Sequence, residues 1–127
     1  MIIKALSVKE PWASRIAYGG KTVETRTWRT SYRGPLLICA SAAPASTVSG
    51  KAVALTTLAD CRLMVPADEE TAQSNWYEDL YAWVLTDVTA VQPFGVKGRQ
   101  GLYAVEIPFD AYDQYQNNRI ARARAAR

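Results

Sequence analysis

Short segments bounded by glycine, proline and small polar residues divide this chain, and no strand–helix unit repeats along it. Apolar runs and alternating stretches of this length predict five or six β-strands. The segments are 2–8, 21–28, 35–41, 51–65, 81–91 and 102–107. Because a parallel sheet requires repeated crossover connections, the pattern favours a mixed, mostly antiparallel sheet. We therefore expect an α+β fold in which the strands close into a small β-barrel with flanking helices.

Helix and loop signals lie between these strands and in the tail. Pro11 fits the first turn of a helix, and the two glycines at 19–20 fit its end. Turn-forming residues predict loops or short helices at 42–50 and 66–80 and a loop at 92–101, and a bend in strand 51–65 is expected at Thr57 or Asp60. The Ala- and Arg-rich C-terminus suggests a domain over residues 1–112 followed by a basic helix or arm over residues 113–127.

Charge is distributed unevenly along the sequence. Residues 1–50 carry seven basic and two acidic side chains, residues 51–112 carry four and nine, and residues 113–127 carry four and one. The net charge of +3 therefore combines a basic first half, an acidic middle and a basic tail. This pattern favours a localised surface that faces anions. The acidic middle leaves open a third role, an adaptor that binds protein partners.

Residue types that are missing exclude several chemistries. The chain has no histidine, so it cannot form a Ser-His-Asp or Cys-His triad. Its two cysteines, Cys39 and Cys61, lie in apolar runs and fit buried free thiols better than zinc ligands. We expect no metal and no cofactor. The sequence shows no signal peptide and no run long enough to span a membrane, so we expect a cytoplasmic protein.

Charged residues in segment 21–28 are the main candidates for a functional site. Glu24 and Arg26 are two residues apart on a predicted strand, so they share one face of the sheet. Charges are rarely buried unless they are paired or used. Two interpretations remain open: an ion pair (Glu24 with Arg26 or with Arg33) that fixes the turn, or a ligand cleft. Lys21 begins this strand and could reach over the mouth of the barrel.

The order of the motifs resembles that of the ASCH domain family (activating signal cointegrator homology). The family pattern is L-S, then P-W, then G-x-K-x-x-E-x-R, present here as Leu6-Ser7, Pro11-Trp12, Gly19, Lys21, Glu24 and Arg26. The motifs YRG at 32–34, YAWVL at 81–85 and KGRQG at 97–101 are also similar to the family. The resemblance extends from residue 3 to about residue 107. It implies a barrel related to PUA domains and a basic cleft that binds RNA or single-stranded DNA.

The resemblance and the chemistry of the side chains together suggest which residues bind a ligand. Arginine offers a planar fork for phosphate, a carboxylate accepts an exocyclic amine, and tryptophan stacks on bases, although Trp12 could equally pack its helix on the barrel. The backbone N–H groups of the 95–101 loop could approach the ligand. The candidate binding residues are Ser7, Trp12, Lys21, Glu24, Arg26, Trp28, Arg33, Lys97, Arg99 and Gln100.

Catalysis is an alternative that the resemblance also implies, because some small family members deacylate acylated cytidine nucleosides and others are ribonucleases. The amidohydrolase members use a lysine, a threonine and a glutamate. Lys21 matches the lysine, Glu24 stands where the threonine is expected, and the second glutamate would fall near Glu69 or Glu70. A lysine in a desolvated cleft can act as base or nucleophile, so Lys21 and Glu24 are the candidate catalytic pair. A ribonuclease would combine Lys21 with Tyr32 or Ser41.

Overall fold

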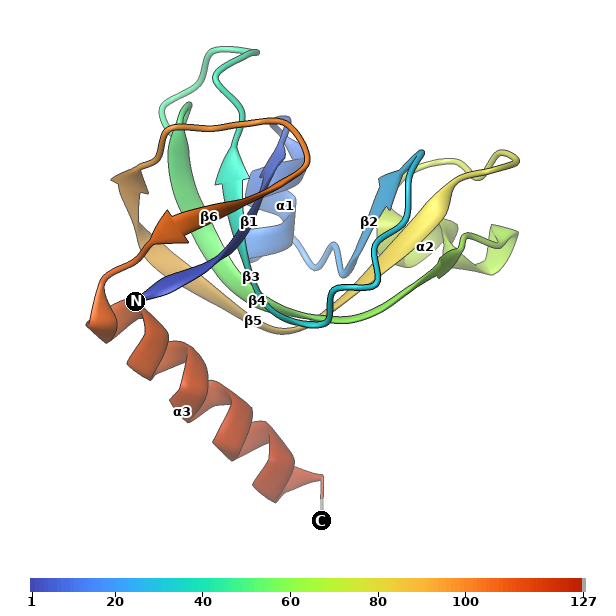
Figure 1. Ribbon diagram of the computed structural model, residues 1–127. Helices are drawn as coiled ribbons and strands as arrows, with labels where there is room; N and C mark the ends of the chain where they lie inside the picture. Colours follow the sequence, from blue (N-terminus) through green and yellow to red (C-terminus); the bar gives the residue numbers. More distant parts are fainter. Residues whose placement is uncertain (127) are drawn as a thin grey trace.

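Six strands form one sheet that curves strongly along its longest strands (Figure 1). The computed structural model describes residues 1–126. The strands are β1 (Ile2–Val8), β2 (Val23–Arg26), β3 (Gly34–Ala40), β4 (Lys51–Leu63), β5 (Tyr81–Gly95) and β6 (Leu102–Glu106). The helices are α1 (Trp12–Tyr18), the short α2 (Glu69–Ala72), which follows a 3-10 turn at Pro66–Asp68, and α3 (Phe109–Ala125). Each predicted strand is confirmed, with shifts at the ends.

The strand order across the sheet is β2-β5-β4-β3-β1-β6. Strands β1 and β3 pair in parallel, and every other neighbouring pair is antiparallel. Within residues 1–126 the outer strands β2 and β6 pair with one neighbour each, so the sheet is open. The mostly antiparallel α+β fold is therefore confirmed, whereas the expected closed barrel is wrong.

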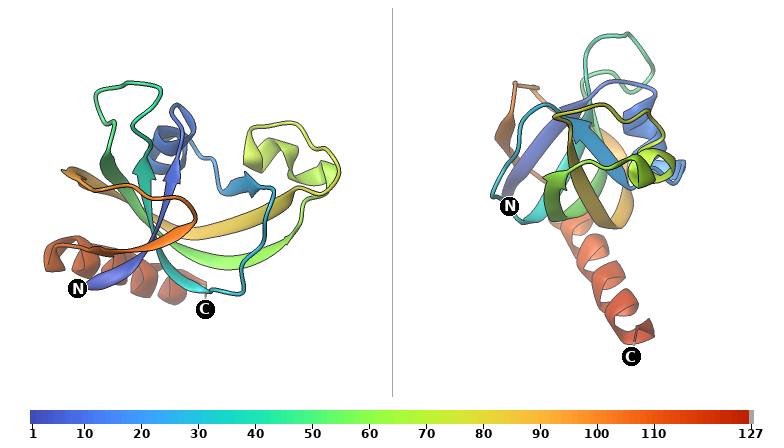
Figure 2. Two further views of the ribbon diagram at one scale, coloured as in Figure 1. Left: turned by 45° about the horizontal axis from the view of Figure 1, so that its top comes forward. Right: turned by 90° about the vertical axis from the view of Figure 1, so that its right-hand side faces the viewer.

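The sheet does not close into a barrel because its two edge strands are short and lie far apart. Strand β2 has four residues and pairs with Tyr81–Val84 at the start of β5. Strand β6 has five residues and pairs with β1 at the other side of the sheet. Figures 1 and 2 show these edges on opposite sides of the molecule, so no hydrogen-bonded ladder joins them. The number and alternation of strands do not specify whether edges meet.

Bulges between β4 and β5 produce the curvature. The pairing register shifts between Ala52 and Ala54, between Leu55 and Thr57, and between Leu58 and Asp60. An extra residue in one strand bends the sheet and increases its twist. The bend expected in this strand is thus confirmed.

The start of the predicted loop at 92–101 is wrong, because β5 continues to Gly95. Proline cannot donate a hydrogen bond to a strand ladder, and for this reason a strand is not expected to continue through Pro93. The pairing of β2 with β5 reaches only Val84, so Pro93 interrupts no bond with that neighbour. The Gly-rich loop therefore begins after residue 95 and is shorter than the sequence suggests.

Helices cover the two faces of the sheet in a way that the strand alternation dictates. Ile16 of α1 packs in one cluster with Leu36 and Ile38 of β3. Tyr115 of α3 packs in a second cluster with Leu37, which lies between those two residues on the same strand. Side chains of successive strand residues point to opposite faces. The two apolar layers therefore place α1 and α3 on opposite sides of the sheet (Figure 2).

Helix α3 packs on the apolar layer around Tyr115, and its second half is mostly exposed. It starts at Phe109, before the range 113–127 expected for a basic helix or arm, and Tyr115 is fully buried. The Tyr115 hydroxyl hydrogen-bonds the Thr57 hydroxyl, which in turn donates to Asp87 Oδ2 at 2.8 Å. Arg127, the last residue of the expected arm, lies outside the described residues. No helix within residues 1–126 has the length and apolarity needed to cross a membrane.

Candidate functional site

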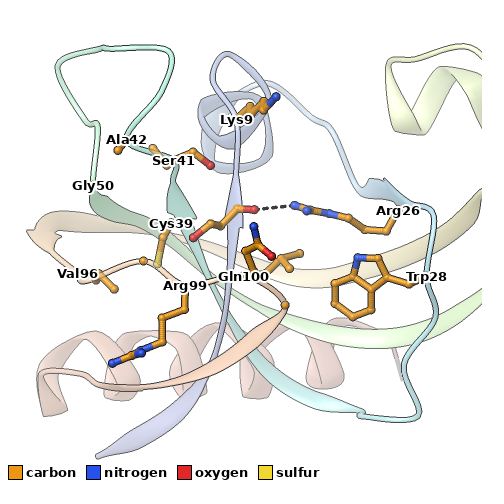
Figure 3. A pocket seen from close by; sticks show the side chains of 15 residues that line it. Lys9, Arg26, Trp28, Cys39, Ser41, Ala42, Gly50, Val96, Arg99 and Gln100 are labelled. Atoms are coloured by element: carbon orange, nitrogen blue, oxygen red, sulfur yellow. Dashed lines mark hydrogen bonds between the residues drawn. The ribbon is translucent and has the colours of Figure 1, made fainter.

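A cleft consisting of two adjoining chambers lies between β1, β2, β3 and the loop that precedes β6. The first, which we name the Gln100 chamber, has a volume of about 750 Å³ (Figure 3). The second, the Trp12 chamber, has a volume of about 620 Å³. The residues that line both chambers are Ser7, Lys9, Arg26 and Ser41. These four polar side chains form the wall that the chambers share.

Three charged side chains, the Glu24 cluster, line the Trp12 chamber at its β2 side. Glu24 Oε1 lies 3.5 Å from Lys21 Nζ, and Glu24 Oε2 accepts a hydrogen bond from Arg26 Nη2 at 3.0 Å. Lys21 is 1% exposed and the Glu24 side chain 9% exposed. The Glu24–Arg26 pair that the sequence suggested is therefore formed, and it is formed beside a cavity. The ion pair and the cleft are compatible interpretations.

Lys21 is held by three acceptors. Its ammonium donates to the carbonyl oxygen of Val23 at 2.8 Å and to the carbonyl oxygen of Ala72 at the end of α2, and it also faces Glu24. Burial lowers the pKa of Lys21 below 10.5, and the neighbouring Glu24 carboxylate opposes this shift. The expectation that Lys21 reaches over the mouth of the barrel is wrong. Strand β2 begins at Val23, so the alternation rule does not extend to Lys21.

Arg26 connects the two chambers. Its Nη2 atom donates to the carbonyl oxygen of Ser7 at 2.6 Å as well as to Glu24. Its Nε atom is buried and has no acceptor, and the same is true of the hydroxyl of Ser74, which lines the Trp12 chamber. A buried donor without an acceptor carries a desolvation penalty. The cleft therefore contains polar groups whose hydrogen bonds are incomplete.

Aromatic side chains lie in each chamber. Trp12, which is 37% exposed, and the exposed Tyr77 line the Trp12 chamber. Trp28 lines the Gln100 chamber and packs edge-on against the buried Trp83, with ring centroids 4.7 Å apart. Figure 3 shows Trp28 and Arg26 on one side of this chamber, and Gln100 lies between them and Cys39. Each chamber thus offers an apolar ring beside cationic and polar groups.

The structure brings most of the predicted binding residues together. Those that line the cleft are Ser7, Trp12, Lys21, Glu24, Arg26, Trp28, Arg99 and Gln100. Lys97 is exposed and lines neither chamber. Arg33 also lies elsewhere: it donates to the carbonyl oxygens of Thr30 and Tyr32 and lies 3.6 Å from Asp60. The alternative pair between Glu24 and Arg33 is therefore not formed.

Sequence reasoning missed several residues of the cleft, among them Lys9, Ser74, Asn75 and Tyr77. Lys9 follows β1, which ends at Val8, so the alternation along that strand does not place it in the cleft. Ser74, Asn75 and Tyr77 follow α2 and reach the Trp12 chamber from the connection to β5. No motif or period in the sequence indicates them, because their position depends on how α2 packs against β2.

Among the remaining residues considered for catalysis, Glu69, Glu70 and Tyr32 lie outside the cleft, whereas Ser41 lies in it. Glu69 Oε2 accepts a hydrogen bond from the Trp76 amide at 2.7 Å, and neither Glu69 nor Glu70 lines a chamber. The Tyr32 hydroxyl donates to the carbonyl oxygen of Pro35 at 2.6 Å, whereas Ser41 lines both chambers. No group of three or more Cys, Asp or Glu residues within 1–126 could hold a metal ion.

The open, curved sheet with its cleft defines a small PUA-like α+β domain. The family model of the ASCH domain matches residues 6–120. That range includes all six strands except the first residues of β1, and the chain therefore belongs to the ASCH domain family. Among curated proteins, none matches this chain.

Solved structures of an ASCH protein from Zymomonas mobilis share the fold. One superposes with a TM-score of 0.61 at 14% sequence identity and covers 93% of each chain. A Tyr-to-Phe variant of that protein gives a TM-score of 0.59 at 14% identity, with 90% of this chain and 96% of the other covered. A Ser-to-Ala variant gives 0.57 at 15% identity, with 90% and 94% covered. At this identity the likeness describes the fold alone.

Proposed function

We propose that this protein binds single-stranded RNA or DNA in the cleft formed by the Trp12 and Gln100 chambers. The observation that carries the proposal is the position of Arg26 and Lys9 in the wall shared by both chambers. A phosphate at this wall would meet a guanidinium fork and an ammonium group. The hydroxyls of Ser7 and Ser41 lie in the same wall and add hydrogen-bonding capacity. Such a ligand also implies a cytoplasmic protein.

The aromatic rings support a single-stranded ligand. Trp12 and Trp28 offer ring surfaces on which unstacked bases can pack, and such stacking contributes roughly 1–3 kcal/mol per base. A duplex hides these base faces inside its own stack. Glu24 at the bottom of the Trp12 chamber can accept a hydrogen bond from an exocyclic amine, as a carboxylate does with cytosine.

A binding titration against salt concentration tests the proposal. Fluorescently labelled single strands of RNA and of DNA are titrated with wild type, Arg26→Gln and Arg33→Gln. We expect Arg26→Gln to weaken binding about tenfold or more and to reduce the salt slope by about 1, because one phosphate contact is lost. Arg33→Gln is the matched control, because Arg33 lies outside the cleft and should leave affinity unchanged.

Two outcomes would contradict the proposal. One is binding that does not respond to salt, and the other is an equal loss of affinity in the two variants. Because Arg26 also pairs with Glu24, thermal unfolding of each variant shows whether the fold is retained. Arg26→Lys adds a second measurement: it keeps the charge but loses the fork, and we expect an intermediate affinity.

Deacylation of acylated cytidine is a second candidate that one observation favours. Lys21, whose pKa burial lowers, lies beside Glu24 at the edge of a chamber large enough for a nucleoside. Water would add across the amide and release the carboxylic acid and cytidine. Incubation with N-acylated cytidine at high protein concentration, followed by mass spectrometry, should then show both products. Absence of turnover under these conditions excludes this candidate and leaves binding.

A further inference from the structure

We infer that the cleft holds two consecutive nucleotides of one strand, with one base in each chamber and the connecting phosphate at Arg26. This inference rests on the proposed function and makes it specific, because it sets the smallest ligand that fills the site. The argument depends on three features: the separate volumes of the chambers, their separate aromatic residues and the composition of their common wall.

The two chambers are each large enough for one nucleoside. Their volumes, about 620 and about 750 Å³, fall within the range of roughly 300–1,000 Å³ typical of small-molecule sites. They adjoin along the line where β1 and β3 end and where Arg26 projects from β2. A single nucleoside can occupy one chamber and leaves the other open. A ligand that uses both must have two such groups joined by a linker.

Each chamber has its own aromatic residues. Trp12 from α1 and Tyr77 from the connection before β5 line only the Trp12 chamber. Trp28, which follows β2, lines only the Gln100 chamber. No aromatic ring lies in the shared wall of the described chain. The stacking surfaces are thus located at two positions and separated by polar groups, which matches two bases on either side of a phosphodiester.

The shared wall has the composition that a phosphodiester requires. Lys9 and Arg26 supply positive charge, and Ser7 and Ser41 supply hydroxyls. The Arg26 guanidinium already donates to the carbonyl oxygen of Ser7 and to Glu24, while its buried Nε atom has no acceptor. A phosphate beside the guanidinium would offer charged acceptors and could complete the hydrogen bonds of Arg26. Arg26 is therefore placed to bind the linkage between the two nucleosides.

The loop after β5, residues 96–101, closes the Gln100 chamber against β1. A Cβ atom at Gly98 would lie 3.2 Å from the Ser7 hydroxyl, so only glycine permits this close approach without a shift of Ser7. Ser7 is fixed there by a 2.7 Å hydrogen bond with the Tyr103 hydroxyl. The loop thus brings Arg99 and Gln100 to the chamber that Lys21 and Glu24 do not line. The two chambers have different polar groups, so the two nucleotides are bound in different surroundings.

A length series measures the predicted unit. Calorimetric titration with oligonucleotides of one, two, three and four residues, in ribose and in deoxyribose form, gives the dissociation constant for each length. We expect the affinity to rise about tenfold or more from one nucleotide to two. Each further nucleotide should change it by about threefold or less, because no further stacking surface lies in the cleft.

Abasic dinucleotides assign each base to a chamber. A dinucleotide that lacks its first base and one that lacks its second base are titrated against Trp12→Ala and Trp28→Leu. We expect a crossed pattern, in which each substitution weakens binding about tenfold only when the base for its own chamber is present. Trp76→Ala is the matched control, because Trp76 is exposed to the same 37% as Trp12 but lines neither chamber. Gln100→Ala repeats the Trp28 measurement without disturbing the contact with Trp83.

The outcomes separate the inference from the function on which it rests. Equal affinities for one and two nucleotides, or a loss in both Trp variants that depends on the same base, would overturn the two-nucleotide site while binding itself stands. If no oligonucleotide of any length binds in a manner that depends on Arg26, the proposed function fails as well. A length series in which affinity grows evenly up to four nucleotides also contradicts the inference and indicates an extended surface.

Discussion

Two carboxylates in this protein each lie between two cations, but in opposite surroundings. Glu24 is nearly buried and contacts Lys21 and Arg26 at 3.5 and 3.0 Å. Asp87 lies 3.8 Å from Arg119 and 3.7 Å from Arg122, whose side chains are 43% and 60% exposed. The first set lines the Trp12 chamber between β1 and β2, whereas the second joins α3 to β5 and lines a smaller, more open hollow of about 420 Å³. The same charges therefore occur once in a largely buried site beside a cleft and once at the surface.

The difference favours the Glu24 cluster as the set with a role beyond holding the fold. An exposed ion pair contributes about 0–1 kcal/mol, and α3 has a stronger attachment in the buried Tyr115. A buried pair costs free energy because both charges lose water, and apolar residues often replace it without loss of stability. Charges retained in such a place beside a cavity with incomplete hydrogen bonds are a physical argument for ligand binding.

The largest expected effect on stability comes from removing Lys21, the more deeply buried cation of the Glu24 cluster. Lys21→Ala leaves Glu24 with one partner and removes a donor from the carbonyl oxygens of Val23 and Ala72. We expect the free energy of unfolding to fall by about 3 kcal/mol, as measured by urea denaturation. Arg122→Ala in the same assay should change it by less than about 0.5 kcal/mol. Similar losses in both variants would show that burial does not distinguish the two sets.

A pH measurement tests how much Asp68, the residue that precedes α2, contributes to the stability of the fold. The hydrogen bonds from Arg62, together with one from the Val65 amide, lower the pKa of Asp68 from 3.8 to about 2, and burial opposes this shift. Asp68 therefore stabilises the fold above pH 4, and this contribution disappears as the pH falls to about 2. The advantage of wild type over Asp68→Asn should shrink by about 2 kcal/mol between pH 5 and pH 2. If the difference in the free energy of unfolding between wild type and Asp68→Asn does not vary with pH, the lowered pKa of Asp68 is contradicted.

The attachment of α3 should depend on a neutral hydrogen bond more than on the ions around Asp87. Tyr115→Phe keeps the buried ring and removes the hydroxyl that bonds Thr57. We expect a loss of about 1 kcal/mol in thermal or chemical unfolding. The Thr57 hydroxyl keeps its partner Asp87, which limits the loss. An effect smaller than that of Arg122→Ala would mean that the ions are the main attachment.

Salt should have the smallest effect on the free energy of unfolding, and it should act on the exposed ions around Asp87 only. Raising the ionic strength from about 0.05 M to about 0.5 M shortens the screening length to a few ångströms. The small difference between wild type and Arg122→Ala should then vanish, whereas the deficit of Lys21→Ala should persist. Chemical denaturation at the two salt concentrations measures both. A deficit of Lys21→Ala that is also lost at high salt would place that cluster in contact with solvent.

The sequence predicted the parts of the site that depend on local periodicity. Glu24 and Arg26 share a face of β2 because they are two residues apart, and this face lines the cleft as expected. The surroundings of Lys21 could not be predicted, because its acceptor at Ala72 lies 51 residues away in the chain. The position of Arg33 depends on β4, which presents Asp60 to it.

The limits of the fold prediction have the same origin. Strand positions follow from alternation and turn residues, and these were correct for all six strands. Whether the sheet closes depends on strand lengths, bulges and the place where β2 pairs on β5. These are properties of pairs of segments, and no single segment contains them. The strand pattern and the resemblance to the ASCH family both suggested a barrel, and the pairing of the six strands leaves the sheet open.

The position of β1 between β3 and β6 has a consequence for folding. Strand β1 pairs with residues 36–40 on one side and with residues 102–106 on the other. The second pairing joins segments that are far apart in the chain, and such long-range pairing is slow to form. Strands β3, β4 and β5 are neighbours in the sequence and can therefore pair first. The Gln100 chamber, which the loop before β6 lines, would then be among the last parts of the fold to form.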